Sequence, residues 1–134
     1  MSDAISWPLD LLYNKEHQWL GVEGDVARSG ITAFGQAQLS DIVMVFPPRV
    51  GDRLTAGEKL MELESTKVVW ELFMPLSGEI VEVNKALDMN PELINQDPHG
   101  LGWLVAIRFN DASELDGLLD ADAYAAFVSS QATT

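Results

Sequence analysis

The sequence predicts a mainly β protein, a compact sandwich or flattened barrel with a helical cap at its C-terminal end. Short runs of apolar and β-branched residues recur along the chain, and clusters of Gly, Pro, Asn, Asp or Ser separate them. Apolar residues at helical spacing are confined to the segment 33–42 and to the end of the chain. No linker or shift in composition divides the 134 residues, so we expect a single domain over 1–134.

The first third of the chain is expected to hold two paired strands and a helix. In order, the expected elements are an irregular lead-in over 1–12, two strands within 17–32, a helix over 33–42 and a strand over 42–46, where the apolar residues form a continuous run. Turn residues around Gly24 separate the paired strands, and Thr32 can cap the helix. Pro47 with Pro48 ends the next strand, because proline cannot donate to a ladder of hydrogen bonds. In the lead-in, Trp7 and Pro8 are expected to pack on the body of the protein.

The rest of the chain predicts a series of strands and then a helical cap over 111–130. In order, the expected elements are a loop-rich segment over 50–60, strands over 60–64, 68–74 and 78–84, an irregular connection over 85–102 with a helical turn at 91–94, a strand over 103–109, and helices over 114–119 and 121–130. Asp111 or Ser113 can cap the first of these helices, and Asp120 the second. The apolar residues expected on the buried face of the first two strands are Leu60, Leu63, Val69 and Phe73, and those on one face of the last helix are Leu119, Ala123 and Phe127.

Charge is the strongest signal in the composition. Asp and Glu number 21 against 8 Lys and Arg, which gives a formal charge of -13. Such a surface repels phosphate backbones, so we expect no nucleic-acid partner. It favours basic surfaces on partner proteins, although adaptation to a salty cytoplasm would give the same composition.

The sequence also argues against several kinds of site. It has no Cys and therefore no disulfide, thiol nucleophile or thiolate metal site. His17 and His99 are too far apart in the sequence to indicate a metal-binding pair. The chain lacks an apolar run of ~18 residues and a basic, apolar start, so we expect no membrane span, no secretory signal and a cytoplasmic location.

One cation, Lys67, lies at the expected tip of a hairpin. It stands in the stretch LMELESTKVVWELFMPLSGEIVEVN, which spans residues 60–84. A hairpin with apolar anchors on both strands can present one side chain to another protein, and lysine offers a long stem with a nucleophilic amine. A lysine in an exposed turn is more often only a solvated residue, so its spacing alone does not indicate a function.

The residues around Lys67 resemble the lipoylation hairpin of the glycine-cleavage H-protein family. The hairpin reads ESTK at 64–67 and PLSGEIVEVN at 75–84. The other segments that resemble the family, in the same order, are KEHQW at 15–19, GITAFGQAQLSDIV at 30–43, VGDRLTAGE at 50–58, LINQDPHGLGWL at 93–104 and ELDGLLDADAY at 114–124. One ESxK motif alone would be weak evidence for the family. The ordered set of segments is strong evidence, because it covers nearly the whole chain.

The resemblance implies a barrel-sandwich hybrid of the lipoyl/biotinyl, H-protein type, with two antiparallel sheets and peripheral helices. It implies that Lys67 carries lipoic acid in amide linkage and that the protein is a non-catalytic carrier without a metal. In glycine cleavage the carrier would accept an aminomethyl group from glycine decarboxylase, present it to aminomethyltransferase and be reoxidised by dihydrolipoamide dehydrogenase. A lipoate–protein ligase or lipoyl transferase would attach the lipoyl group, and we expect the chain to be a monomer.

Three residues before the lysine form the recognition collar that the resemblance implies for the lipoylating enzyme. They are Glu64, Ser65 and Thr66. Serine and acidic residues also favour turns, so formation of the hairpin explains Glu64 and Ser65 equally well.

The resemblance also implies a cleft in which the loaded arm rests, lined by His17, Gln18, Trp70 and Glu71. Family members have a glutamate at the position of Gln18 and an aspartate at that of Glu71, which help to hold the aminomethyl cation. Here the first position is neutral and the second carries a longer acid. Trp70 replaces a residue that is usually small, which indicates either a different cargo or docking partner, or cross-strand packing.

These departures leave a second function about as well supported by the sequence. The lipoate-binding proteins of bacterial and archaeal sulfur oxidation resemble H-proteins closely and serve a heterodisulfide-reductase-like complex. An intact lipoylation hairpin with an altered aminomethyl pocket fits that group, whereas abundance favours glycine cleavage. A relay that only passes lipoate to other carriers is a third alternative. An interaction domain with an unmodified Lys67 is a fourth, and the intact ESTK motif argues against it.

Overall fold

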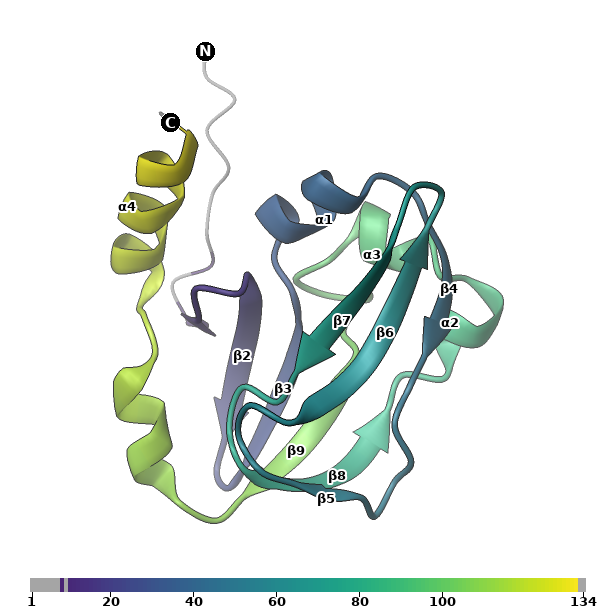
Figure 1. The fold of residues 1–134 in the computed structure, drawn as a ribbon. Coiled ribbons are helices and arrows are strands. Elements are labelled where there is room, and N and C mark those ends of the chain that lie inside the picture. Colours follow the sequence, from purple (N-terminus) through teal and green to yellow (C-terminus); the bar gives the residue numbers. More distant parts are fainter. Residues whose placement is uncertain (1–7, 9, 133–134) are drawn as a thin grey trace.

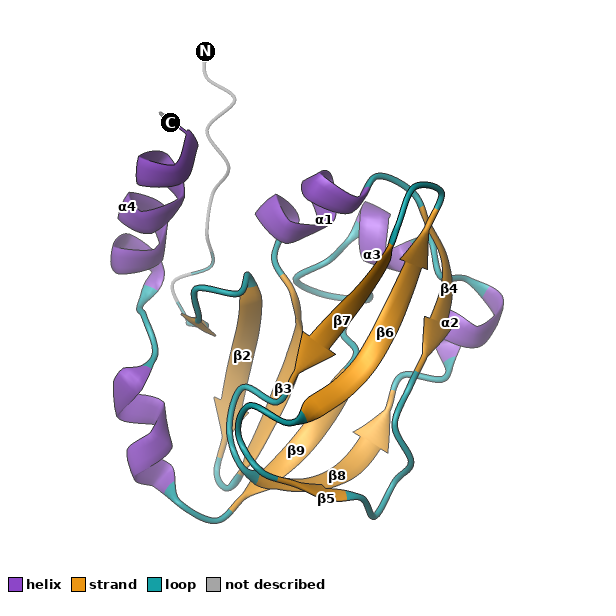
Figure 2. Cartoon of the chain, viewed as in Figure 1, coloured by secondary structure: helices purple, strands orange, loops and turns teal. Residues whose placement is uncertain are grey.

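The computed structural model describes residue 8 and residues 10–132, which form two antiparallel β-sheets with short helices around them (Figures 1 and 2). In spatial order, the large sheet contains β1 (Leu12–Tyr13), β2 (Gln18–Glu23), β3 (Val26–Ile31), β9 (Val105–Phe109), β8 (Gly78–Val83) and β5 (Arg53–Leu54). The small sheet contains β4 (Ile42–Phe46), β6 (Lys59–Ser65) and β7 (Val69–Phe73). The predicted mainly β sandwich is confirmed, while Trp7 and its expected packing lie outside the described residues.

The two sheets enclose the main hydrophobic core. The small sheet lies over the large one (Figure 1), and buried side chains of both meet between them. Leu63 and Leu72 come from the small sheet, and Leu20, Ile80 and Ile107 from the large one. Burying side chains of this size stabilises a fold by about 1.5–3 kcal/mol each. The β6–β7 hairpin is therefore fixed in place by its own apolar side chains.

Three of the five helices in the described part of the chain begin where the sequence predicts caps. The five are α1 (Ala33–Leu39), α2 (Ala86–Met89), α3 (Leu93–Gln96), the 3-10 helix η1 (Ala112–Gly117) and α4 (Ala121–Ala132). Of these, α2 and α3 begin without a side-chain cap. Thr32 accepts from the amide of Gly35 at the start of α1, and Asp111, not Ser113, caps η1. The carboxylate of Asp120 accepts from the third residue of its helix, Ala123. Within the described residues, no helix combines the length and the apolar character that crossing a membrane requires.

The loops hold more regular structure than the sequence predicts. The two-residue strand β5 lies within the segment 50–60, which was expected to be loop. The connection 85–102 contains both α2 and α3, where one helical turn was expected. The last helix continues to Ala132, two residues beyond the predicted end. Short elements of this kind are held by neighbouring chain segments and carry little periodicity of their own.

Half of the predicted anchors of the hairpin are wrong. Leu60 and Leu63 are buried as expected, but Val69 and Phe73 are 54% and 37% exposed. Successive side chains of a strand point to opposite faces, and on β7 it is Leu72 that enters the core. The apolar character of Val69 and Phe73 did not reveal their face, because β7 carries apolar residues on both sides.

The apolar face predicted for the last helix is also wrong at one position. Ala123 is exposed, whereas Ala121 and Tyr124, three residues apart, are buried. The ring of Tyr124 stacks on that of Tyr13 with 4.7 Å between centroids, and Phe127 packs beside them. This stack sets the rotation of α4 about its axis and turns Ala123 toward solvent.

Replacement of Leu72 by alanine tests the position of β7. Leu72→Ala is expected to lower the free energy of unfolding by about 2–5 kcal/mol, because it leaves a cavity between the sheets. Leu101→Ala makes the same change at a side chain that is 65% exposed and should alter it by less than about 0.5 kcal/mol. Urea titrations followed by tryptophan fluorescence measure both values. Equal losses in the two variants would contradict the core position of Leu72.

Candidate functional site

Lys67 lies at the exposed end of the β6–β7 hairpin, and Figure 1 shows this end of the hairpin at the upper right, beside α1. The three residues 66–68 connect the two strands, and we call them the tip loop. All three are exposed. The lysine amine is therefore open to another protein, while the strands that carry it are anchored in the core.

The side chain of Ser65 braces the tip loop from within. Its hydroxyl oxygen accepts hydrogen bonds from the backbone amides of Lys67 and Val68, both at 3.1 Å. The hydroxyl in turn donates to the carbonyl oxygen of Val68 at 3.2 Å, and the side chain is only 6% exposed. Ser65 thus satisfies two amides of the loop that carries the lysine, which explains why a short hydroxyl residue stands there.

The other two residues of the expected collar lie outside this brace. The amide of Thr66 donates to the carbonyl oxygen of Asp41 at 3.1 Å, and its hydroxyl lies 3.2 Å from that of Ser40. Glu64 is half-buried on β6, opposite Val69 of β7. The structure therefore brings all three collar residues beside Lys67 but gives each of them different surroundings.

A cleft of about 800 Å³ opens beside the tip loop. Its lining comes from the tip loop and β7, from α1, from α4 and from the segment before β2. The residues that matter below include Val68, Trp70, Phe34, Leu39, Phe127 and His17. Trp70 and His17 were predicted to line such a cleft, and the structure places both there.

His17 connects the cleft to the packing of α4. Its backbone φ of 67° is unusual for a residue with a side chain. Its Nδ1 lies 2.8 Å from the hydroxyl of Tyr124, which lies 2.7 Å from that of Thr32, and its ring packs on Phe34. Burial lowers the pKa of His17 below its ordinary value of 6.5, although a hydrogen bond with Gln131 opposes this. Because burial is the larger effect, the net lowering favours a neutral ring at pH 7.

Gln18 does not line the cleft. Its side chain is 1% exposed, and its Nε2 donates to the carbonyl oxygen of Phe73 at 2.9 Å. Its Oε1 accepts from Asn14 at 2.7 Å. The side chain therefore ties β2 of the large sheet to β7 of the small sheet, and its neutral amide is needed as a donor. The expectation that Gln18 lines the cleft is wrong, because its alternation along β2 turns it into the interior.

Glu71 is likewise outside the cleft. Side chains alternate along β7, so Glu71 lies on the opposite face from Trp70. Its carboxylate is half exposed and lies 3.5 Å from the amine of Lys59, which also pairs with Glu62. Trp70 stands opposite Leu63 and packs partly against the core, so cross-strand packing accounts for part of its role.

Several lining residues were not predicted from the sequence. Phe34 and Leu39 lie in the segment 33–42, for which the sequence predicts only a helix, and Phe127 is predicted only on one face of the last helix. They form one wall because α1 and α4 both pack near the segment before β2. Only their contact in three dimensions distinguishes them from core residues.

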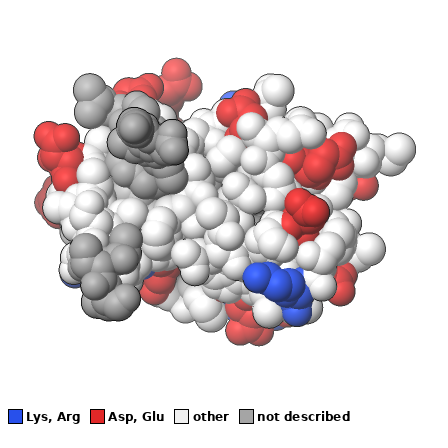
Figure 3. Space-filling view, turned by 90° about the horizontal axis from the view of Figure 1, so that it is seen from above, with Lys and Arg blue, Asp and Glu red and all other residues white. Residues whose placement is uncertain are grey.

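The end of the molecule that carries the tip loop is mostly uncharged at its centre (Figure 3). In this view Asp and Glu lie mainly toward the margins, and Lys and Arg are few. An uncharged centre within an acidic margin suits docking to a partner surface that is basic around its edge.

The chain matches the family model described as glycine cleavage H-protein over residues 11–131. A glycine cleavage system H protein of Bacteroides thetaiotaomicron is 51% identical over 124 residues, which cover 92% of this chain and 98% of that protein. Another, of Symbiobacterium thermophilum, is 51% identical over 120 residues, which cover 90% of this chain and 94% of that protein. A crystal structure of a glycine cleavage system H protein from Mycobacterium marinum matches with a TM-score of 0.81 at 38% identity, over 92% of this chain and 99% of that one.

Gln18→Glu tests the tie between the sheets. The change replaces a donating amide by a carboxylate oxygen that faces the carbonyl of Phe73. We expect a loss of about 1–3 kcal/mol in the free energy of unfolding at pH 7, because a buried hydrogen bond is replaced by repulsion. Gln38→Glu adds the same charge at an exposed site and is the control. A Gln18→Glu protein as stable as this control in urea would contradict the tie.

Stability should also fall as the pH is lowered from about 7 to 5. Burial lowers the pKa of His17 and of His99 in the folded protein, so the unfolded chain binds more protons in this range. The stability that neutral histidines contribute is present above pH 6.5 and is lost as the pH falls through the folded pKa. His17→Gln and His99→Gln should each reduce the slope of unfolding free energy against pH. Unchanged slopes in both variants would contradict this origin.

Proposed function

Because the chain belongs to the glycine cleavage H-protein family, we propose that it carries lipoic acid on Lys67 and passes an aminomethyl group between enzymes. Members of this family are carrier subunits that are not themselves catalysts, and they carry lipoic acid covalently on a lysine. The observation that supports Lys67 is its position at an exposed hairpin tip whose loop is braced by Ser65.

The cleft beside the tip loop suits a lipoyl arm. Amide formation removes the charge of Lys67 and leaves a long, largely apolar chain. The cleft begins at Val68, next to the lysine, and Phe34, Leu39 and Phe127 supply apolar walls that would hold such a chain. When attached, lipoic acid supplies a reducible disulfide whose sulfur can hold a one-carbon group. A flexible arm also raises the effective concentration of that group at each partner enzyme.

The polar groups of the cleft are neutral. His17, Gln38, Ser130 and Gln131 line it, and no carboxylate is among its lining residues in the described part of the chain. A bound aminomethyl group would therefore be held by hydrogen bonds to neutral acceptors and by apolar contact. Glu71, the nearest counterpart of the acid expected there, faces away and pairs with Lys59.

The partners follow from the family. Glycine decarboxylase, aminomethyltransferase and dihydrolipoamide dehydrogenase are the enzymes that a glycine cleavage H protein implies. For the attachment of lipoic acid we add a lipoate–protein ligase or lipoyl transferase. The inward hydroxyl of Ser65 supports a loop-forming role for that residue, so we assign contact with the attaching enzyme to Glu64 and Thr66.

The comparisons give no support to a carrier for sulfur oxidation. That alternative rested largely on the neutral Gln18 and the bulky Trp70. Gln18 is buried in the tie between the sheets and does not line the cleft, so its charge carries no information about cargo. Trp70 packs partly against the core, which accounts for its size.

Lys67→Arg is expected to abolish lipoylation while the protein stays folded. Arginine keeps the positive charge and the length of the side chain but offers no amine for an amide bond. The two proteins would be incubated with lipoate, ATP and a purified lipoate–protein ligase, and peptide mass spectrometry would locate the added group.

Lys85→Arg, at another exposed lysine, is the matched control and should be modified like the wild type. Lipoate found on any other lysine, or persisting in Lys67→Arg, would refute the assignment of Lys67.

A further inference from the structure

We propose that Asn95 is a positioning residue for the lysine that bears the lipoyl group. Its side-chain amide holds a sharp bend at residues 40–42, and that bend in turn holds the tip loop. The inference rests on the proposed attachment of lipoic acid to Lys67, and its first test is chosen to be independent of that attachment.

The bend connects α1 to β4 in a backbone conformation that needs support. Ser40 ends α1 with φ 60° and ψ -148°. A positive φ favours glycine, and a residue with a Cβ is strained there. Such a conformation persists only where surrounding contacts hold it.

Asn95 contacts the bend from both sides. Its Nδ2 donates to the carbonyl oxygen of Ser40 at 2.8 Å, and its Oδ1 accepts from the amide of Ile42 at 2.9 Å. One backbone partner is an acceptor and the other a donor, so the two contacts fix the orientation of the amide group. Asn95 itself is fixed because its neighbour in α3, Ile94, is fully buried in the core.

The bend then contacts the tip loop through two atoms of Thr66. The carbonyl oxygen of Asp41 accepts from the Thr66 amide at 3.1 Å, and the hydroxyls of Ser40 and Thr66 lie 3.2 Å apart. Ser65 serves the amides of the next two residues, Lys67 and Val68. The loop thus has an inner support, which is part of the hairpin, and an outer support, which depends on Asn95.

The outer support matters because an enzyme that modifies or uses Lys67 must find it in one place. If the loop spends only a fraction of its time in the competent conformation, the apparent affinity falls by that fraction. The rate at saturation does not fall. Loss of the Asn95 contacts should therefore raise KM for lipoylation and leave kcat unchanged.

Asn95→Asp is the variant that tests this with the least change in shape. Aspartate keeps an acceptor for the amide of Ile42, but it loses the donor to Ser40 and faces that carbonyl with an anionic oxygen. Should this variant fail to fold, Asn95→Ala removes both contacts without adding charge and takes its place.

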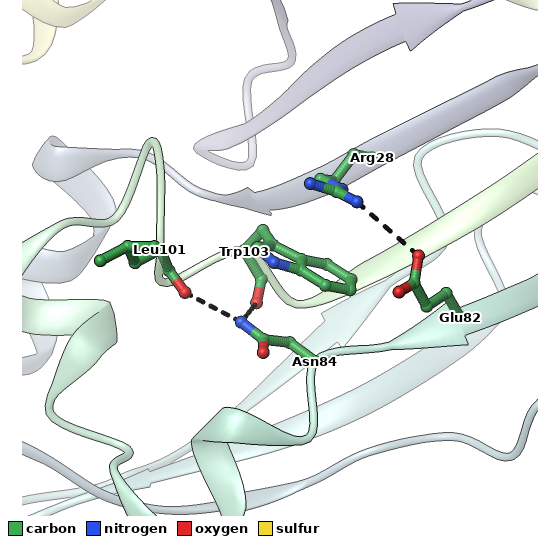
Figure 4. Close-up of polar contacts among 5 residues, drawn as sticks. All are labelled: Arg28, Glu82, Asn84, Leu101 and Trp103. Carbon is green, nitrogen blue, oxygen red and sulfur yellow. Dashed lines mark hydrogen bonds and ion pairs between the residues drawn. The ribbon is translucent and has the colours of Figure 1, made fainter.

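Asn84 offers a matched control elsewhere in the fold (Figure 4). Its Nδ2 donates to the carbonyl oxygens of Leu101 and Trp103 at 2.9 and 2.8 Å, and its Oδ1 accepts from the amide of Ala86 at 3.2 Å. Asn84→Asp thus removes the donor side of the same kind of two-sided contact and adds the same charge. It does so where β8 ends in the large sheet, and none of these contacts involves the tip loop.

The first measurement is hydrogen exchange of the Thr66 amide, followed by NMR on unmodified protein. We expect faster exchange in Asn95→Asp than in the wild type, and no acceleration in Asn84→Asp. An unchanged rate in Asn95→Asp, or equal acceleration in both variants, would overturn the proposal. This result does not depend on lipoic acid, so it stands even if Lys67 proves not to be modified.

The second measurement is the kinetics of lipoylation by a purified lipoate–protein ligase. Asn95→Asp is expected to raise KM about tenfold at unchanged kcat, as it would if the loop were competent about a tenth of the time. Asn84→Asp should keep the wild-type KM. A fall in kcat at constant KM would overturn a positioning role. Absence of modification in the wild type would refute the proposed attachment of lipoic acid to Lys67. The hydrogen-exchange result alone would then decide whether Asn95 holds the tip loop.

A rescue separates positioning from general support of α3. Glycine adopts a positive φ without strain, so Ser40→Gly lets the bend form without the hydrogen bonds of Asn95. Added to Asn95→Asp, it should restore the bond between Asp41 and Thr66, although the contact of the Ser40 hydroxyl with Thr66 is lost, and KM should move part of the way back toward the wild-type value. A KM that stays raised in the double variant would contradict the role of the bend.

Discussion

The hydroxyl of Ser65 determines how the hairpin ends. Core side chains such as Leu63 and Leu72 fix the two strands, and the strands therefore fix both ends of the tip loop. Ser65 satisfies the amides of Lys67 and Val68 from inside the loop. Without that acceptor, two backbone donors at the tip would rely on water alone, and the direction of the lysine would no longer be fixed. The support that Ser65 gives to Lys67 is thus part of the hairpin itself.

The C-terminal helix does more than cover the sheet. Tyr124 anchors α4 by stacking on Tyr13 and by its contact with His17. That anchoring places Phe127 on the wall of the cleft. The proposed resting site of the arm therefore depends on the packing of both ends of the chain. A change that loosens α4 should alter the cleft even though it lies far from Lys67 in the sequence.

The sequence predicted the β class, the hairpin and the position of Lys67, because turn residues and an ordered set of family-like segments are local signals. The sequence-based predictions were wrong where contacts between distant segments determine which way a side chain faces. Gln18 and Glu71 are matched to family positions by sequence alone, yet alternation along β2 and β7 turns both away from the cleft. Ala123 was placed on the wrong face because a single aromatic stack sets the rotation of α4. The contacts of Asn95 with the bend had no sequence signal, since they join residues 53 and 55 apart in the chain.

The exchange of labelled bicarbonate into the carboxyl group of glycine tests the central claim most directly. The assay would combine glycine decarboxylase from the same organism with this protein, after intact mass confirms complete lipoylation. Rapid exchange that depends on the lipoylated carrier, and that vanishes when unmodified protein replaces it, is the result expected of an aminomethyl carrier. No exchange from fully lipoylated protein would contradict a role in glycine cleavage and would show that the arm carries a different cargo.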